Sequence, residues 1–170
     1  ALESTGANCV FSSEINKYSC ATYEGNFGEY PEGDITEIHS KDVPEHDILC
    51  AGFPCQPFSQ ASVPKYQSLG RKTGFEHETQ GSLFHDVCRI LKYHRPKAFI
   101  LENVKHLKGH DKGNTWRIIE NSLRELDYTI YHKIIDAQKL VPQHRERIFI
   151  VGFADEIKFE WPDIENKKPI

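Results

Sequence analysis

Several features that would place this chain in a specialised class of protein are absent from its sequence. It has no methionine, no run of 18 apolar residues that could span a bilayer, and no C-x-x-C pair among its five cysteines. The odd cysteine count argues against a disulfide framework, and the absence of paired cysteines argues against a zinc site, so we expect no metal. The first residues carry neither the basic nor the apolar segment of a secretory signal. We therefore expect a reducing, intracellular setting.

The bulk composition is that of one ordinary globular domain, with 170 residues, 38% hydrophobic and 27% charged. The net charge of −4 hides an asymmetry. Residues 1–50 carry two basic and ten acidic residues, whereas residues 86–117 carry eight basic and three acidic ones. A basic stretch of this kind permits a nucleic-acid partner, but it is equally typical of a solvated helix face.

The order of the expected elements indicates an α/β fold. Strands alternate with helices, which predicts a mainly parallel, doubly wound sheet, and the last two closely spaced strands predict an antiparallel edge. The expected strands are residues 8–14, a short strand after a turn at 33–36, a buried strand at 47–50, and strands at 97–101, 128–136 and 147–153; the expected helices are 16–26, 79–93 and 115–126. Residues 1–4 have the pattern of the end of a helix, with Gly6 as its stop signal.

Two stretches have no regular pattern. Residues 60–79 are polar and contain two glycines and three cations, which suits either a lid that closes over an anionic partner or an ordinary surface loop. Residues 154–170 are acidic, contain proline and predict no clear element. We therefore divide the chain into a domain at 1–153 and a tail at 154–170.

One loop, Ala51-Gly52-Phe53-Pro54-Cys55-Gln56-Pro57-Phe58-Ser59, has the residues of a reactive turn. Its two prolines fix their own φ angles and disfavour helix in the residues before them, so a stiff turn should present Cys55 at the end of a strand. Open α/β sheets bind their ligands at that end of the strands. Cys55 is then either a nucleophile or a buried structural cysteine.

Three carboxylates also end expected strands or turns. Glu102 follows a mostly apolar strand, where a carboxylate suits acid–base chemistry. Glu14 stands where an acidic residue of a nucleotide-binding unit commonly binds ribose hydroxyls, although a surface glutamate fits equally well. Asp34 either caps the following turn, which we favour, or faces a ligand.

Three stretches together resemble one family: Gly52-Phe53-Pro54-Cys55-Gln56-Pro57-Phe58-Ser59, Glu102-Asn103-Val104 and Gln143-His144-Arg145-Glu146-Arg147. In this order they resemble the cytosine-5 DNA methyltransferases, especially the bacterial enzymes of modification systems. Residues 79–84 and 111–113 also look like that family, and the resemblance runs from near residue 1 to about residue 153. It implies the Rossmann-like fold of S-adenosylmethionine-dependent methyltransferases and an enzyme of the bacterial cytoplasm, associated with the nucleoid when on DNA.

The resemblance implies methyl transfer from S-adenosylmethionine to C5 of cytosine in double-stranded DNA. The thiolate would add to C6 of a base flipped out of the duplex, and the stretch from Ser59 to about Glu78 would close over it. The implied residues are Cys55 (nucleophile), Glu102 (pyrimidine edge), Arg147 (base carbonyl) and Arg145 (thiolate) for catalysis; Glu14, Ile15, Asp34, Ile35, Phe53, Pro54 and Leu83 for the methyl donor; and Gln56 and Ser59 for DNA.

The chain also departs from the family pattern. The family's first strand and glycine-rich turn would precede Ala1, and its target-recognition domain would follow Ile170. We therefore expect these 170 residues alone to bind the donor poorly and not to methylate, the other parts lying elsewhere in the gene or in a partner polypeptide. Two alternatives stay open: a catalytically silent fragment or subunit of a split methyltransferase, and a transfer RNA cytosine-5 methyltransferase.

Overall fold

The computed structural model describes residues 2–54 and 82–164, which fall into two compact units, one over residues 1–46 and the other over residues 47–170. The first unit contains two short 3-10 helices, Leu2–Thr5 and Ser40–Asp42, and the α-helix α1, Lys17–Phe27. The side chain of Asn16 caps α1 by accepting hydrogen bonds from the backbone N–H groups of Tyr18 and Ser19, and Gly28 ends it in a left-handed conformation, φ 76°. The helix expected at 16–26 is confirmed.

The strand expected at 8–14 is wrong, because these residues form only an isolated parallel bridge between Ser13 and Glu32. Two flanking hydrogen bonds support it: the N–H of Glu32 donates to Ser12 O (2.8 Å), and the N–H of Glu14 donates to Glu32 O (3.0 Å). A strand needs a neighbouring backbone alongside it for several residues, and the two segments run together too briefly for that. The turn expected at 33–36 is present, but no strand follows it in the described first unit.

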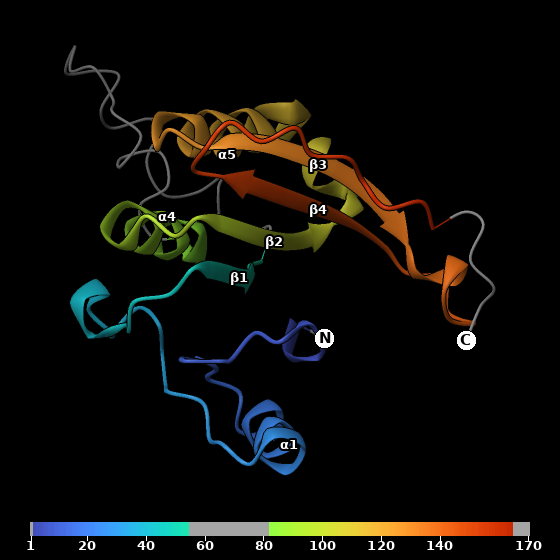
Figure 1. The fold of residues 1–170 in the computed structure, drawn as a ribbon. Helices are drawn as coiled ribbons and strands as arrows, with labels where there is room; N and C mark the ends of the chain where they lie inside the picture. Colours follow the sequence, from blue (N-terminus) through green and yellow to red (C-terminus); the bar gives the residue numbers. More distant parts are fainter. Residues whose placement is uncertain (1, 55–81, 165–170) are drawn as a thin grey trace. The chain divides into compact units, whose positions relative to one another are not determined.

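The second unit is built on a four-stranded sheet with the order β1-β2-β4-β3 (Figure 1). The strands are β1 Ile48–Gly52, β2 Ala98–Val104, β3 Thr129–Asp136 and β4 Glu146–Phe153. β1 and β2 are parallel, whereas β2–β4 and β3–β4 are antiparallel. The α/β class and the antiparallel final strands are confirmed. The antiparallel share of this sheet is larger than expected, because β4 returns between β2 and β3 instead of adding to an outer edge.

Two amphipathic helices pack on the sheet: α4, Leu83–His94, and α5, Asn114–Glu125. The Oγ of Ser82 caps α4 at the N–H of His85, and the helix ends at Arg95, which has a left-handed φ of 51° and precedes Pro96. Short 3-10 turns at Lys105–Lys108, His110–Gly113 and Ala137–Lys139 connect the remaining elements. The core joins both helices to the sheet through fully buried side chains: Phe84, Leu91, Phe99, Leu101, Leu107, Ile119, Leu123, Ile148 and Ile150.

Alternation along β2 assigns its side chains to two faces. Phe99, Leu101 and Asn103 are buried in the core face, and the intervening Ile100 and Glu102 are half-buried on the opposite face. Gly152 of β4 lies opposite Phe99, and a Cβ at that position would overlap the Phe99 ring, so the core requires glycine there.

The prediction of a buried strand at 47–50 is wrong in its burial. β1 is present, but it is an edge strand in the described sheet, and Ile48 is 42% exposed. An edge strand has a partner on one side only, so an apolar sequence alone does not bury it.

Residues 154–164 form no helix or strand, as expected. They nevertheless contact the sheet through a hydrogen bond and through aromatic rings. The phenol of Tyr131 in β3 donates a hydrogen bond to Ile157 O (2.7 Å). The aromatic rings of Tyr131, Phe153, Phe159 and Trp161 form a connected group with centroid separations of 5.1 to 6.3 Å. On another part of the unit, Trp116 of α5 lies edge-on to His132 of β3, at 4.6 Å.

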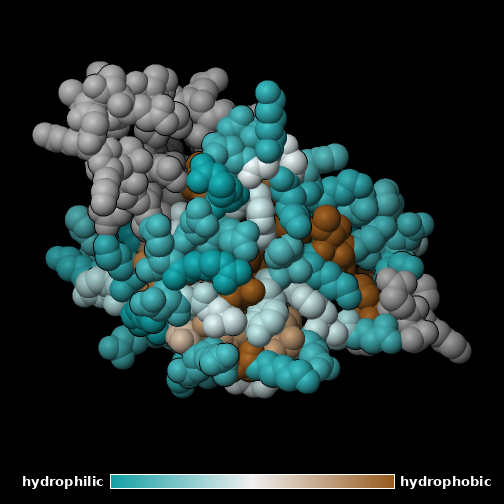
Figure 2. All heavy atoms as spheres, turned by 90° about the horizontal axis from the view of Figure 1, so that it is seen from above, coloured by the Kyte–Doolittle hydropathy of each residue, from teal (hydrophilic) through white to brown (hydrophobic). Residues whose placement is uncertain are grey.

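The face seen in Figure 2 is mainly hydrophilic, and its hydrophobic residues form small separate patches. In the described ranges 2–54 and 82–164, no helix is both long enough and apolar enough to cross a membrane.

Candidate active site

A carboxylate and a guanidinium meet across two neighbouring strands of the second unit. Arg147 Nε in β4 lies 2.8 Å from Glu102 Oε1 in β2, and the side chains are 22% and 37% exposed. Arg147 Nη1 also donates to Glu146 O at 2.9 Å, so the arginine is held by two acceptors. Glu102 is therefore fixed in orientation while remaining open to a ligand.

Gly52, the last residue of β1, lies beside this pair. It is the register partner of Glu102, and a Cβ at Gly52 would sit 3.5 Å from Glu102 Oε2. A glycine thus keeps side-chain atoms away from the second carboxylate oxygen. The three residues bring the end of β1, the end of β2 and the start of β4 together at one place on the sheet.

The turn after β1 is fixed by two contacts of Phe53, one through its ring and one through its backbone carbonyl. Phe53 is 6% exposed, and its ring packs on Phe84 of α4 with a centroid separation of 5.1 Å. The Nδ2 of Asn103 donates to Phe53 O at 2.6 Å, and Asn103 Oδ1 accepts from the N–H of Val104 at 2.8 Å. Sequence reasoning assigned no role to Asn103. Its only signal was the position next to Glu102 in the Glu-Asn-Val triplet.

The remaining predicted residues near this turn are placed as follows. Pro54 is exposed, and Leu83 begins α4 and packs half-buried against the core. The predicted nucleophile and the two predicted DNA contacts, Cys55, Gln56 and Ser59, lie outside the described residues.

Arg145 precedes β4 in a loop that Asp136 organises. Asp136 Oδ1 accepts from the N–H groups of Gln138 (3.1 Å) and Arg145 (3.0 Å), and Asp136 Oδ2 lies 2.7 Å from His144 Nδ1. The hydrogen bond from Gln138, followed by those from Arg145 and His144, lowers the pKa of Asp136. Sequence reasoning missed this aspartate, because its partners include residues eight and nine positions away.

The structure does not bring the Arg145 side chain into the Glu102 pair. It is exposed, and it makes no hydrogen bond or ion pair with the residues that the structure describes. A lysine supports the loop instead: Lys105 Nζ forms an ion pair with Glu146 Oε2, next to Arg147.

The predicted donor-binding residues of the first unit lie at the same end of its parallel bridge. Glu14 and Asp34 follow the bridged residues Ser13 and Glu32 by one and two positions. Glu14 Oε1 accepts from the N–H of Asn16 (2.8 Å). Asp34 Oδ1 accepts from both the N–H and the Oγ1 of Thr36 (2.9 and 2.8 Å), which confirms the expected cap.

The free side of these residues is available for a ligand. The backbone and hydroxyl hydrogen bonds from Thr36 lower the pKa of Asp34, which stays ionised, and its Oδ2 accepts no hydrogen bond from the described part of the chain. Ile15 is 70% exposed, and Ile35 is half-buried. Two acceptor carboxylates and an exposed apolar side chain therefore share one end of the first unit.

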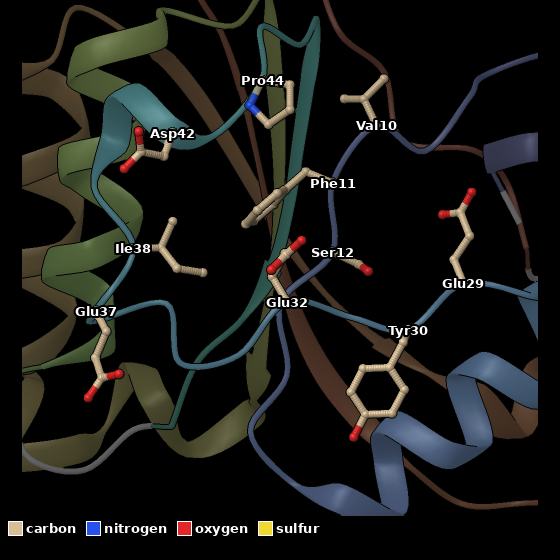
Figure 3. Close-up of a pocket in the computed structure, with 10 residues that line it drawn as sticks. All are labelled: Val10, Phe11, Ser12, Glu29, Tyr30, Glu32, Glu37, Ile38, Asp42 and Pro44. Carbon is tan, nitrogen blue, oxygen red and sulfur yellow. The ribbon is translucent and has the colours of Figure 1, made fainter.

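The first unit also contains a pocket of about 500 Å³ that none of the predicted residues lines (Figure 3). Phe11 and Ile38 extend toward each other across it, and Glu37 points away. Its lining is apolar and acidic: Val10, Phe11, Ser12, Glu29, Tyr30, Glu32, Glu37, Ile38, Asp42 and Pro44. The lining residue Glu32 accepts a backbone hydrogen bond from Glu14, so the pocket adjoins the predicted donor-binding residues without including them.

The backbone is similar to that of the Entamoeba histolytica methyltransferase EhMeth, with a TM-score of 0.68 over 94% of this chain and 49% of that chain. The sequences are 22% identical, so this similarity establishes the methyltransferase-type α/β fold and nothing finer.

The family follows from the sequence. The model of the C-5 cytosine-specific DNA methylases matches residues 1–170, and the chain belongs to that family. It is 52% identical over 162 residues to Type II methyltransferase M.HaeII of Haemophilus aegyptius, covering 95% of this chain and 48% of that protein. It is 51% identical over 162 residues to Type II methyltransferase M1.ScrFI of Lactococcus lactis subsp. cremoris, covering 95% and 39%. The chain spans less than half the length of these relatives.

Proposed function

We propose that this chain carries the catalytic part of an enzyme that methylates C5 of cytosine in double-stranded DNA. The observation that carries the proposal is the Glu102–Arg147 pair beside Gly52, at the end of the strand that leads into Cys55. The family membership of the chain supports the same reaction. We further propose that the protein acts in the bacterial cytoplasm, on a base flipped out of the duplex.

The proposed chemistry begins with the thiolate of Cys55, which forms a bond to C6 of the cytosine. Glu102 hydrogen-bonds N3 and the exocyclic amine and keeps the ring protonated, so the electron pair from the C5–C6 double bond becomes available at C5. Arg147 holds Glu102 and the base carbonyl. C5 would then take the methyl group from a bound donor, which would leave as S-adenosylhomocysteine, and loss of the C5 proton to solvent would release the thiolate. Arg145 favours the ionised thiol, since a cation lowers the pKa of a cysteine.

S-adenosylmethionine would supply the methyl group in this reaction. The residues of the first unit would hold its nucleoside: Glu14 would accept from the ribose hydroxyls, Asp34 Oδ2 would accept from the exocyclic amine, and Ile15 would pack on the adenine with Ile35 at its edge. Phe53, Pro54 and Leu83 would bind the rest of the donor, and Gln56 and Ser59 would contact DNA.

The proposal can be tested by grafting. The part of this chain that aligns with M.HaeII replaces the matching segment of that protein, and the purified graft is incubated with S-adenosylmethionine and duplex DNA that contains 5-fluorocytosine. Fluorine at C5 blocks proton loss, so a competent nucleophile gives a stable covalent adduct. We expect an adduct from the graft, none from the graft carrying Cys55→Ser, and an undiminished one from the matched control Cys9→Ser.

No adduct from a folded graft would overturn the proposal, and an undiminished adduct with Cys55→Ser would reassign the nucleophile. The ungrafted chain is expected to remain inactive because it spans less than half of the relatives' length. A parallel incubation with transfer RNA and labelled donor separates the two substrate classes.

A further inference from the structure

Asn103 occupies a position that a polar side chain rarely takes. It is 3% exposed, on the core face of β2 between Leu101 and the end of the strand. Both ends of its amide are hydrogen-bonded, Nδ2 to Phe53 O and Oδ1 to the N–H of Val104. A buried amide persists only where its donors and acceptor are matched, so this one is held by specific partners.

The amide continues the pairing of β1 and β2 beyond its last backbone step. The parallel register runs from Ile48 opposite Ala98 to Gly52 opposite Glu102. Phe53 is the first residue after β1, and its carbonyl accepts from the Asn103 side chain. Pro54 follows and has no N–H to contribute. The Asn103 side chain thus supplies a hydrogen bond between the two segments one residue beyond the end of their backbone pairing.

We propose that Asn103 is a positioning residue, which fixes the Phe53–Pro54 backbone and through it the start of the segment that carries Cys55. The link from Asn103 to catalysis rests on the proposed function, whereas the hydrogen bonds of Asn103 do not depend on it. Two neighbouring residues of β2 have different roles. Glu102 pairs with Arg147 on the face proposed to bind the pyrimidine, and Asn103 points into the core and holds the adjacent turn. The end of β2 therefore holds both the Glu102–Arg147 pair and the Phe53 backbone.

The chemistry requires an amide at position 103. An ionised carboxylate of the same shape only accepts hydrogen bonds, so it would place two oxygens against each other at Phe53 O. An apolar side chain would leave that carbonyl without a donor in a residue that is 6% exposed. Phe84, which packs on the Phe53 ring, cannot replace the lost hydrogen bond.

Residue-resolved hydrogen exchange on the 170-residue chain tests the anchor. The variant is Asn103→Asp, and the matched control is Asn121→Asp on the exposed surface of α5. Loss of one buried hydrogen bond should accelerate exchange of the Gly52 and Phe53 amides roughly 5- to 10-fold, with β3 and β4 unchanged. Equal acceleration throughout the sheet would make Asn103 a general stabiliser, and no acceleration would remove its role. Either result overturns the proposal.

The pH dependence of the same variant separates hydrogen bonding from packing. Burial at position 103 raises the pKa of the introduced carboxyl, and the protonated form can donate to Phe53 O, so the exchange ratio of Asn103→Asp to the unmodified chain should fall toward one as the pH is lowered from 8 to 5. Packing alone would give a ratio that does not depend on pH, which contradicts the proposal. The Asn121→Asp ratio is expected to stay flat.

Alkylation of cysteines by iodoacetamide connects the anchor to Cys55. Peptide mass spectrometry gives the rate at each cysteine, with the exposed Cys9 as the internal reference. We expect the Cys55-to-Cys9 rate ratio to change about threefold or more in Asn103→Asp and not in Asn121→Asp. An unchanged ratio alongside faster local exchange would overturn the positioning of Cys55. If 5-fluorocytosine trapping fails in the graft while these ratios change, the proposed function fails and the anchor stands.

Discussion

Different interactions stabilise the interior of each of the two units of this chain. In the second unit, α4, α5, β2 and β4 bury a continuous apolar core, and Phe84, Phe99, Ile119 and Ile150 are 0% exposed. In the first unit, α1 buries only Cys20, and its surface exposes Tyr18 at 72%. Short-range hydrogen bonds that side-chain oxygens such as those of Asn16 and Asp34 accept from nearby backbone N–H groups stabilise the turns of that unit.

The difference suggests how the proposed reaction is divided. The Glu102–Arg147 pair stands on strands that a packed core fixes, which suits groups that must be aligned to within a fraction of an ångström. The candidate donor-binding residues Glu14 and Asp34 stand on a frame with little core. We expect the first unit to open locally at a lower free energy than the second.

The largest effect should come from the chemistry of the second unit. Glu102→Gln in the grafted enzyme keeps an oxygen for Arg147 but removes the carboxylate, so adduct formation with 5-fluorocytosine DNA should slow by about 10²- to 10⁴-fold. Glu125→Gln, exposed on α5, is the matched control and should leave the rate unchanged. A loss of less than tenfold would remove Glu102 from the reaction and weaken the contrast.

Core truncation should give the next largest effect. Phe99→Ala removes a fully buried ring and should lower the free energy of unfolding by about 3–5 kcal/mol. Tyr18→Ala removes an exposed ring of α1 and should change it by no more than about 0.5 kcal/mol. Urea unfolding of the 170-residue chain, followed by circular dichroism, measures both. Equal losses would show that the first unit is packed as tightly as the second.

Glycine-to-alanine substitutions should have opposite signs in the two units. At Gly152 a Cβ would overlap Phe99, so Gly152→Ala should cost about 1–3 kcal/mol, and adding Phe99→Leu should recover part of the loss. Gly25 lies within α1, and a Cβ added there would meet nothing within 4 Å, so Gly25→Ala should stabilise by about 0.5–1 kcal/mol. Thermal melts compare the two. Destabilisation at Gly25 would reveal packing that the structure does not contain.

The smallest effect concerns the loop before Arg145. Because the pKa of Asp136 is lowered on folding, its contribution to stability is present above its unfolded pKa of about 3.9 and is lost as the pH falls through the folded value. Asp136→Asn should therefore destabilise the chain at pH 7 and match the unmodified chain in strong acid. Asp155→Asn, exposed in the tail, is the control. A pH-independent difference would show that the aspartate acts through its shape.

Local rules predicted much of this fold. The helix that became α1, the apolar period of α4 and α5, and the strands β2, β3 and β4 were predicted, because each depends on residues close in sequence. The exposure of β1 was not, since it depends on where the strand lies in the sheet.

The candidate site, too, was predicted from the sequence only in part. Glu102 and Arg147 could be proposed from sequence motifs, and the structure pairs them. The bond between Asn103 and Phe53 joins residues 50 positions apart, and no local pattern indicates it. The hydrogen bond from the N–H of Arg145 to Asp136 likewise joins the two ends of a loop, nine positions apart.

The edge-on contact between Trp116 and His132 gives the second unit an internal optical probe. The chain has two tryptophans, and the other, Trp161, lies edge-on to Phe159 in the tail. Burial, with a further effect of the nearby Lys108 charge, lowers the pKa of His132 below that of a free imidazole. A protonated imidazole quenches indole emission, and the light emitted by Trp116 therefore registers the charge between α5 and β3 without any added label.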